Sequence, residues 1–225
     1  DEVPGLPLYL GSRSLPGESS DKYSKAAKQI IDTGLNCLGT TTTPEFGLTG
    51  TTESLRFGAT CNPWNTAYST GGSSGGSSAL VAAGVIPIAH ANDGAGSIRI
   101  PASCCGLVGL KASRGRIKDK EVPGYLPANI LHDGVVTRSV RDTWAFHAEI
   151  EKNIPATELP PIGDISESFP KNLKIAVLTE NCLGEDSSAE LVQATHDVAR
   201  LCESLGHEVE MISVSYTHLR AHETR

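Results

Sequence analysis

The sequence predicts an α/β protein. Residues 78–85 are apolar and rich in helix-forming residues, and residues 86–91 then form a short apolar run bounded by turn residues. This order is typical of a buried helix that leads into a strand. Residues 173–179, 187–205 and 208–212 follow one another as an apolar run, a helical pattern and a second apolar run, which predicts a strand–helix–strand unit.

The remaining elements are predicted by shorter patterns. Residues 21–34 have an amphipathic pattern that follows a capping-type Ser-Ser-Asp start and ends at Gly34, so we expect a helix there. Residues 35–40 predict a strand, and the apolar residues 107–111, which follow a glycine, predict another. Residues 152–172 contain several prolines and are expected to form a connector.

Composition narrows the classes of function. The chain has 225 residues, enough to bury a sizeable core, and a formal net charge of −7, which argues against nucleic-acid binding. No apolar run is long enough to predict a membrane span, and no signal segment opens the chain. The six cysteines have no metal-binding spacing, so we expect buried free thiols in a reducing compartment and a cytoplasmic location.

A Gly/Ser-rich segment is the most informative feature. Residues 71–78 read Gly-Gly-Ser-Ser-Gly-Gly-Ser-Ser, a composition that by itself is more typical of a flexible linker. The helix and strand predicted directly after it place the segment inside a domain instead. Ser73 therefore becomes a candidate catalytic hydroxyl, because glycine-rich backbone can bend sharply and present bare N–H groups.

A second glycine-rich segment lies downstream. Residues 92–99 read Asn-Asp-Gly-Ala-Gly-Ser-Ile-Arg, and an ordinary turn with Ser97 as a helix N-cap is the alternative interpretation. A serine at a helix N-terminus also lies where N–H donors converge, and Gly94 and Gly96 have no Cβ to obstruct a substrate carbonyl. A nucleophilic hydroxyl beside backbone donors is what a serine hydrolase requires.

Residues 71–78, 93–101 and 105–111, with the upstream residues 43–47 and 62–65, resemble the amidase signature family of serine amidohydrolases. The resemblance is close over residues 1–140 and continues more weakly to about residue 212. It implies a mixed β-sheet flanked by helical layers, incomplete here because the family fold needs a longer chain. We therefore expect residues 1–212 to be a partial amidase signature domain.

The resemblance also implies roles in a Ser–cis-Ser–Lys triad. Ser97 corresponds to the acylated nucleophile, and Ser73 to the bridging serine that follows a cis peptide bond and relays the proton to a neutral lysine. The backbone amides of Gly94, Ala95 and Gly96, with that of Ser97, correspond to the oxyanion hole. Ala95 stands where many family members have glycine, a change that retains the amide donor.

Two charged residues flank this turn, and one expected residue is absent. We interpret Asp93 and Arg99 as a supporting ion pair on the oxyanion loop; two solvated surface charges are the alternative. The family places its catalytic lysine just before Asp1, so the chain as written is expected to lack its general base. Lys22 and Lys25 lie on the amphipathic helix, where we expect them to be solvated.

The C-terminal residues have a different origin in our interpretation. Residues 214–224 can be back-translated into a transposon-type sequencing-library adapter, so residues 213–225 are predicted to be a non-native tail and are excluded from the fold. The alternative is a natural polar tail whose two histidines bind a metal. The other histidines, including His90, are scattered along the sequence; we expect no metal site, no cofactor and no Ser-His-Asp triad.

Three hypotheses for function follow. The first is a metal-independent serine amidase that hydrolyses linear or cyclic carboxylic amides, with a small-molecule amide as its partner and homodimerisation left open. The second is the glutaminase-type subunit of a tRNA-dependent amidotransferase, in which the position of Ile100 is often Gln. The third is an inactive truncated fragment.

Overall fold

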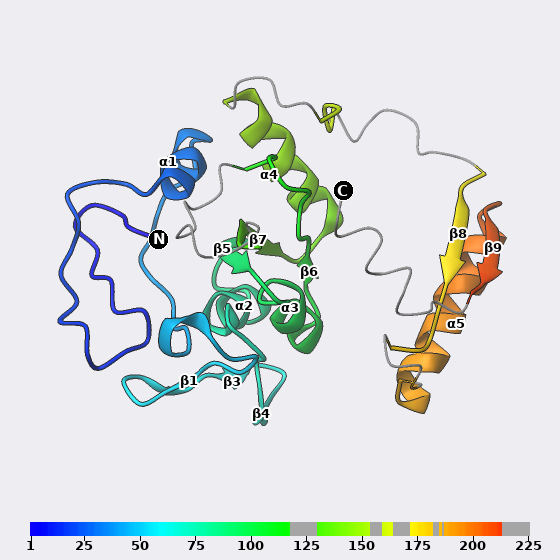
Figure 1. The fold of residues 1–225 in the computed structure, drawn as a ribbon, viewed down its shortest axis with the longest axis horizontal. Helices are drawn as coiled ribbons and strands as arrows, with labels where there is room; N and C mark the ends of the chain where they lie inside the picture. The colour runs from blue at the N-terminus through cyan, green and yellow to red at the C-terminus, as the bar shows by residue number, and fades with distance from the viewer. Residues whose placement is uncertain (118–129, 154–158, 164–171, 182–184, 186, 213–225) are drawn as a thin grey trace. The chain divides into compact units, whose positions relative to one another are not determined.

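A computed structural model of the chain describes residues 1–117, 130–153, 159–163, 172–181, 185 and 187–212. The chain divides into two compact units, Asp1–Ile165 and Ser166–Arg225, which are described separately (Figure 1). The predicted connector at 152–172 lies partly outside the described residues, and the predicted tail lies wholly outside them.

The first unit is built on a three-stranded antiparallel sheet. Its strand order is β5 (Ile88–Asp93), β7 (His132–Thr137) and β6 (Val108–Gly109), with β7 in the centre. In the register of the sheet, His90 lies opposite Val135. Every residue of β7 is buried, as expected for a strand that is paired on both edges and covered on both faces.

Helices cover both faces of this sheet (Figure 1). Val136 points toward α2 (Gly75–Ala82) and α3 (Arg99–Cys105), where it packs in a cluster with Val81, Ala89, Ala91, Ile98 and Ala102. Val135 points the other way, toward α4 (Val140–Lys152), and packs with Ile117, Phe146 and Ile150; Ile30 of α1 (Lys25–Asp32) lies against that second cluster. Successive strand residues face opposite sides, so the predicted helical layers are confirmed.

Short irregular hairpins occupy the segment before α2. They are β1 (Glu53–Ser54) with β2 (Gly58–Ala59), and β3 (Cys61–Asn62) with β4 (Asn65–Ser69). A 3-10 turn, η1 (Glu45–Gly47), precedes them. The guanidinium of Arg56 lies 3.8 Å from the centre of the Tyr9 ring and donates to the carbonyl of Ser12 at 3.0 Å, which holds the N-terminal loop against the hairpins.

The second unit confirms the predicted strand–helix–strand. Strands β8 (Lys174–Val177) and β9 (Glu208–Met211) are parallel, and α5 (Ala189–Ser204) connects them. Parallel neighbours require a crossover of this kind. The described residues thus contain an antiparallel sheet in the first unit and a parallel pair in the second.

Several predicted elements need correction. The first helix begins only after Ser24, whose side chain accepts from the N–H of Ala27, and not at the earlier Ser-Ser-Asp. Residues 35–40 form no strand, since no described strand pairs with them, and Leu38 is 82% exposed. Helix α3 has Ile98 at its N-cap, so Ser97 is not the capping residue. Strand β7 and helix α4 were not predicted.

Two predictions from composition have a counterpart in the structure. The described cysteines, which exclude Cys182, are all free thiols. Their predicted burial is wrong for most of them, since Cys105 is buried and Cys202 half-buried, whereas Cys37, Cys61 and Cys104 are exposed. Among the helices that the structure describes, none combines the length and the apolar character needed to cross a bilayer.

Acid sensitivity is expected from His147 of α4, which is 1% exposed. Burial, assisted by the charge of Arg116 and opposed by that of Glu151, lowers its pKa from 6.5 to about 4. As the pH falls from 6.5 toward 4, the unfolded state takes up a proton that the folded state does not, so stability should fall across this window by about 3 kcal/mol.

Denaturant unfolding at pH 7 and at pH 4.5 would measure this loss, and His147→Gln should flatten the dependence. The same change at His196, a half-buried residue of α5, controls for the removal of an imidazole. Equal pH dependence in His147→Gln and the parent protein would contradict the assignment.

Candidate active site

The Gly/Ser-rich loop runs directly against the segment that precedes it in the fold. A Cβ on Gly72 would lie 2.7 Å from the carbonyl carbon of Thr51, and one on Gly76 would lie 2.5 Å from the amide nitrogen of Thr42. Real Cβ atoms essentially never come this close, so these positions require glycine. The peptide bond between Gly72 and Ser73 is cis, as the family resemblance implied.

Thr52 organises this loop, and the sequence analysis missed it. The residue is 1% exposed, and its Oγ1 donates to the carbonyl of Gly71 at 2.9 Å while it accepts from the N–H of Gly75 at 3.0 Å. These bonds bracket Ser73, whose side chain is buried. Nothing in the local threonine-rich sequence distinguishes Thr52, because its partners are about twenty residues away.

Replacing Thr52 by valine should loosen the loop around Ser73. Loss of a buried hydroxyl that serves as donor and acceptor costs about 1–3 kcal/mol, and a comparable loss in the transition state would slow a reaction that uses Ser73 about tenfold to a hundredfold. Thr49→Val is the matched control, because Thr49 is exposed. Steady-state kinetics of the two variants, each in a version of the protein extended at both ends, would test the prediction; equal rates would contradict it.

The turn after β5 is organised around Asp93, a fully buried carboxylate. Its Oδ1 accepts from the N–H of Gly96 at 2.7 Å and from Nη2 of Arg99 at 3.1 Å. Its Oδ2 accepts from Nε of Arg99 at 2.9 Å and from the N–H of Ile98 at 3.3 Å. One carboxylate therefore fixes the backbone on both sides of Ser97.

The same contacts keep Asp93 ionised. Burial by itself raises the pKa of this carboxyl, but the hydrogen bonds from Arg99, Gly96 and Ile98, together with the Arg99 charge, outweigh burial and lower the pKa below 3.8. The pKa of Arg99 is raised by the same pair, mainly through its hydrogen bond to Asp93. The arrangement is an ion pair with a buried acid, in contrast to two solvated charges.

Tertiary structure brings the two serine segments together. The N–H of Ser74 donates to the carbonyl of Ser97 at 3.3 Å, so the residue after one candidate serine is bonded to the other. The hydroxyl of Ser74 lies 3.3 Å from both the N and the O of Asn92, which ties the loop to β5. Ser73 is buried and Ser97 is half-buried.

The predicted oxyanion donors differ in what surrounds them. The N–H of Gly96 is directed to Asp93, whereas Gly94 is half-buried and Ala95 is exposed. Turn η1 also reaches the site, because a Cβ on Gly47 would lie 3.5 Å from Oγ of Ser73. Residues 43–47, which contribute to the family resemblance, therefore also lie close to Ser73.

One set of potential metal ligands occurs among the described residues. Oxygen or nitrogen atoms of Asp1, His90 and Asp133 lie within 4.8 Å of one another. The Nε2 atom of His90 is 2.9 Å from a carboxylate oxygen of each aspartate. An imidazole with two carboxylates is a donor set that divalent ions accept, and an imidazole that is hydrogen-bonded to Asp133 and in close contact with Asp1 has the same geometry. The expectation of no metal stays a prediction.

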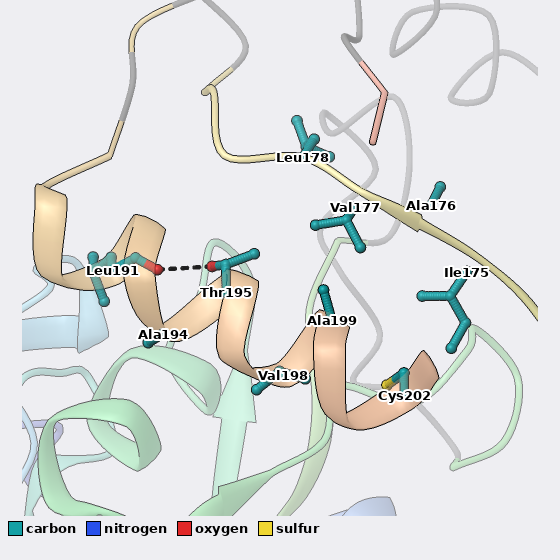
Figure 2. Close-up of a pocket in the computed structure, with 10 residues that line it drawn as sticks. All are labelled: Ile175, Ala176, Val177, Leu178, Leu191, Ala194, Thr195, Val198, Ala199 and Cys202. Carbon is teal, nitrogen blue, oxygen red and sulfur yellow. Dashed lines mark hydrogen bonds between the residues drawn. The ribbon is translucent and has the colours of Figure 1, made fainter. Parts of the chain in front are cut away.

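A groove of about 450 Å³ lies between α5 and β8 in the second unit (Figure 2). Its lining is almost entirely apolar: Ile175, Ala176, Val177, Leu178, Leu191, Ala194, Thr195, Val198, Ala199 and Cys202. The hydroxyl of Thr195 donates to the carbonyl of Leu191. The groove offers apolar packing surface but no acid or base, so the first unit holds the candidate active site.

Comparison with known proteins assigns the family. The model of the family described as Amidase matches residues 2–223. The chain belongs to the amidase signature family. The match extends across part of the predicted tail, whose origin stays a prediction. The chain spans less than half the length of the curated relatives it matches, so the family assignment applies to part of a longer fold.

Relatives of this amidase family member support the same assignment. The Mycobacterium tuberculosis protein AmiC, which carries the name of an amidase, is 47% identical over 94% of this chain and 44% of its own length. The 6-aminohexanoate-cyclic-dimer hydrolase of Paenarthrobacter ureafaciens is 42% identical over 86% of this chain and 41% of its own length. A solved structure of 6-aminohexanoate cyclic dimer hydrolase with its substrate superposes with a TM-score of 0.82 at 35% identity, over 94% of this chain and 46% of the other.

Proposed function

We propose that this chain is part of a serine amidase in which Ser97 is the nucleophile and Ser73 the proton relay. The observation that carries the proposal is the hydrogen bond between Ser74 and Ser97, which joins the Gly/Ser-rich loop to the turn held by Asp93. A nucleophile, a neighbouring hydroxyl and a fixed turn of backbone donors are the components of acyl transfer to serine.

In this mechanism, Oγ of Ser97 attacks the amide carbon and its proton passes through Ser73 to a neutral lysine. The family resemblance places that lysine just before Asp1, in the longer protein. The oxyanion is held by the amides of Gly94, Ala95, Gly96 and Ser97; because Gly96 already donates to Asp93, the others are assigned the larger share. The C–N bond then breaks, the nitrogen leaves with a proton, and water hydrolyses the acyl-enzyme.

The proposed substrates are linear or cyclic carboxylic amides. The similarity to 6-aminohexanoate-cyclic-dimer hydrolase supports a compact cyclic or aliphatic amide. Ile100 supports hydrolysis in preference to the glutaminase-type alternative, in which this position is often Gln. Its side chain lies over the turn, since a Cβ on Gly96 would be 2.7 Å from Cδ1 of Ile100. Ile100 is therefore proposed to contribute an apolar wall next to the nucleophile.

Covalent labelling tests the proposal. A version of the protein extended at both ends should react with a fluorophosphonate probe, and peptide mapping should locate the adduct on Ser97. It should also release amine from aliphatic amides without a partner protein. Labelling at another residue, or none, would overturn the nucleophile assignment. Ammonia release from glutamine only in the presence of a partner would instead support the amidotransferase alternative.

A further inference from the structure

His90 contacts two buried acids on the face of the sheet opposite Asp93. Its Nε2 lies 2.9 Å from Oδ2 of Asp1 and 2.9 Å from Oδ1 of Asp133, and the two acidic side chains are 5% and 2% exposed. The mechanism above uses none of these three residues. Their position in the sheet suggests what they do.

The sheet register explains why these side chains meet. Asp133 of β7 lies opposite Asn92 of β5, and His90 lies opposite Val135. His90 and Asp133 are therefore diagonal neighbours on one face, within reach of each other's side chains. Val135 on this face packs against α4, so the His90 pair lies on the α1 and α4 side of the sheet. Asp93 lies on the other side of β5, since it is an odd number of residues from His90.

Asp1 reaches this pair from the beginning of the chain, and the next residue is anchored as well. The carbonyl of Glu2 accepts from the N–H of Ser24 at 3.0 Å, at the N-cap of α1. The N-terminal segment is thus held at two consecutive residues, one on β5 and one on α1. Because adjacent Cα atoms are about 3.8 Å apart across a planar peptide, these contacts also confine the residue that precedes Asp1.

We propose that His90 is a positioning residue of the active site, which ties Asp1, and with it the preceding lysine, to strand β5. The inference rests on the proposed function, which assigns that lysine as the general base. Strand β5 also ends at Asp93, the acid that fixes the turn of Ser97. The base and the nucleophile would then be held by opposite faces and different positions of one strand.

Two features make this link specific. Nε2 of His90 lies against both acids, so its removal takes away the contact that joins Asp1 to the strand. Strand β5 is itself fixed beside His90, whose carbonyl accepts from the hydroxyl of Ser77 in α2 at 2.7 Å. A displacement of about 1 Å at a positioning contact can reduce the rate about a hundredfold, so the loss should appear in acylation.

The test uses the longer protein that includes the lysine, with fluorophosphonate labelling of Ser97 followed over time. His90→Leu should slow labelling about tenfold to a hundredfold, and His90→Gln, which retains an N–H donor, should recover part of that loss. Asp133→Asn provides an independent variant on β7 and should also slow labelling. Thermal unfolding of each variant identifies any that fails to fold.

A lysine-free background separates positioning from a general structural effect. If the preceding lysine is replaced by methionine, His90→Leu should leave the residual labelling rate unchanged. An equal loss in both backgrounds, or no loss in either, would overturn the proposal. A chelator that slows labelling of the parent protein to the rate of His90→Leu would also overturn the proposal. That result would mean that a metal ion joins Asp1, His90 and Asp133. If the parent protein is not labelled at Ser97, the proposed function itself is refuted. This outcome can be distinguished from failure of the His90 proposal, in which the parent protein is labelled.

Discussion

If Ser97 is the nucleophile, replacing it by alanine is expected to abolish covalent labelling and to reduce amide hydrolysis by about 10⁴-fold or more, as removal of the nucleophile does in serine hydrolases. The substitution removes only Oγ. The structural link to the Gly/Ser-rich loop uses the Ser97 carbonyl, which accepts from Ser74, so the variant should keep its fold. Substrate binding should change little, and the loss should appear in kcat.

The matched control is Ser103→Ala, which removes an exposed hydroxyl from α3. It should label and hydrolyse at the parental rate. Labelling and hydrolysis would be measured in the version extended at both ends, with circular dichroism to verify the fold. Persistent labelling of Ser97→Ala would show that another residue is the nucleophile.

The second largest effect is expected from Asp93→Asn. The carboxylate accepts four hydrogen bonds, two from backbone N–H groups around Ser97 and two from Arg99. An asparagine has one acceptor oxygen, and its amide group would face N–H donors. We expect a loss of about 2–3 kcal/mol in stability, from N–H groups left without an acceptor. We also expect hydrolysis to fall by about 10²–10³-fold, as when an oxyanion donor is lost.

Arg99→Met separates the contribution of the Arg99 ion pair from that of the backbone hydrogen bonds to Asp93. The Arg99 side chain is 55% exposed, so solvent screens its ion pair with Asp93, and its loss should have the smaller effect. The acid range provides a further check. Because the pKa of Asp93 is lowered from 3.8, its contribution is present above that value and is lost as the pH falls through the folded-state pKa. Asp93→Asn should lack this loss. Equal activity of Asp93→Asn and Arg99→Met would contradict a role of Asp93 in fixing the backbone around Ser97.

The candidate site was predictable to the extent that its residues are contiguous. Both glycine-rich segments are recognisable in the sequence, and in the first of them close approach leaves no room for a Cβ at Gly72 or Gly76. The relation between the segments was not readable from spacing. The role of Thr52 in holding the Gly/Ser-rich loop, and that of Asp93 as acceptor for the N–H of Gly96, depend on contacts that form only when the chain folds.

The sequence by itself determined the family, both serine segments and the strand–helix–strand of the second unit. These features depend on hydrophobic periodicity and on positions that must be glycine, and both can be recognised in short stretches of sequence. Tertiary structure alone decided that residues 132–137 form the central strand. The segment begins with polar residues, so its sequence does not predict a buried strand, and it becomes buried because it pairs on both edges. It also decided the meeting of Asp1, His90 and Asp133, which come from three distant parts of the chain. Pairing across a sheet joins residues regardless of their separation in sequence, and no local pattern records that choice.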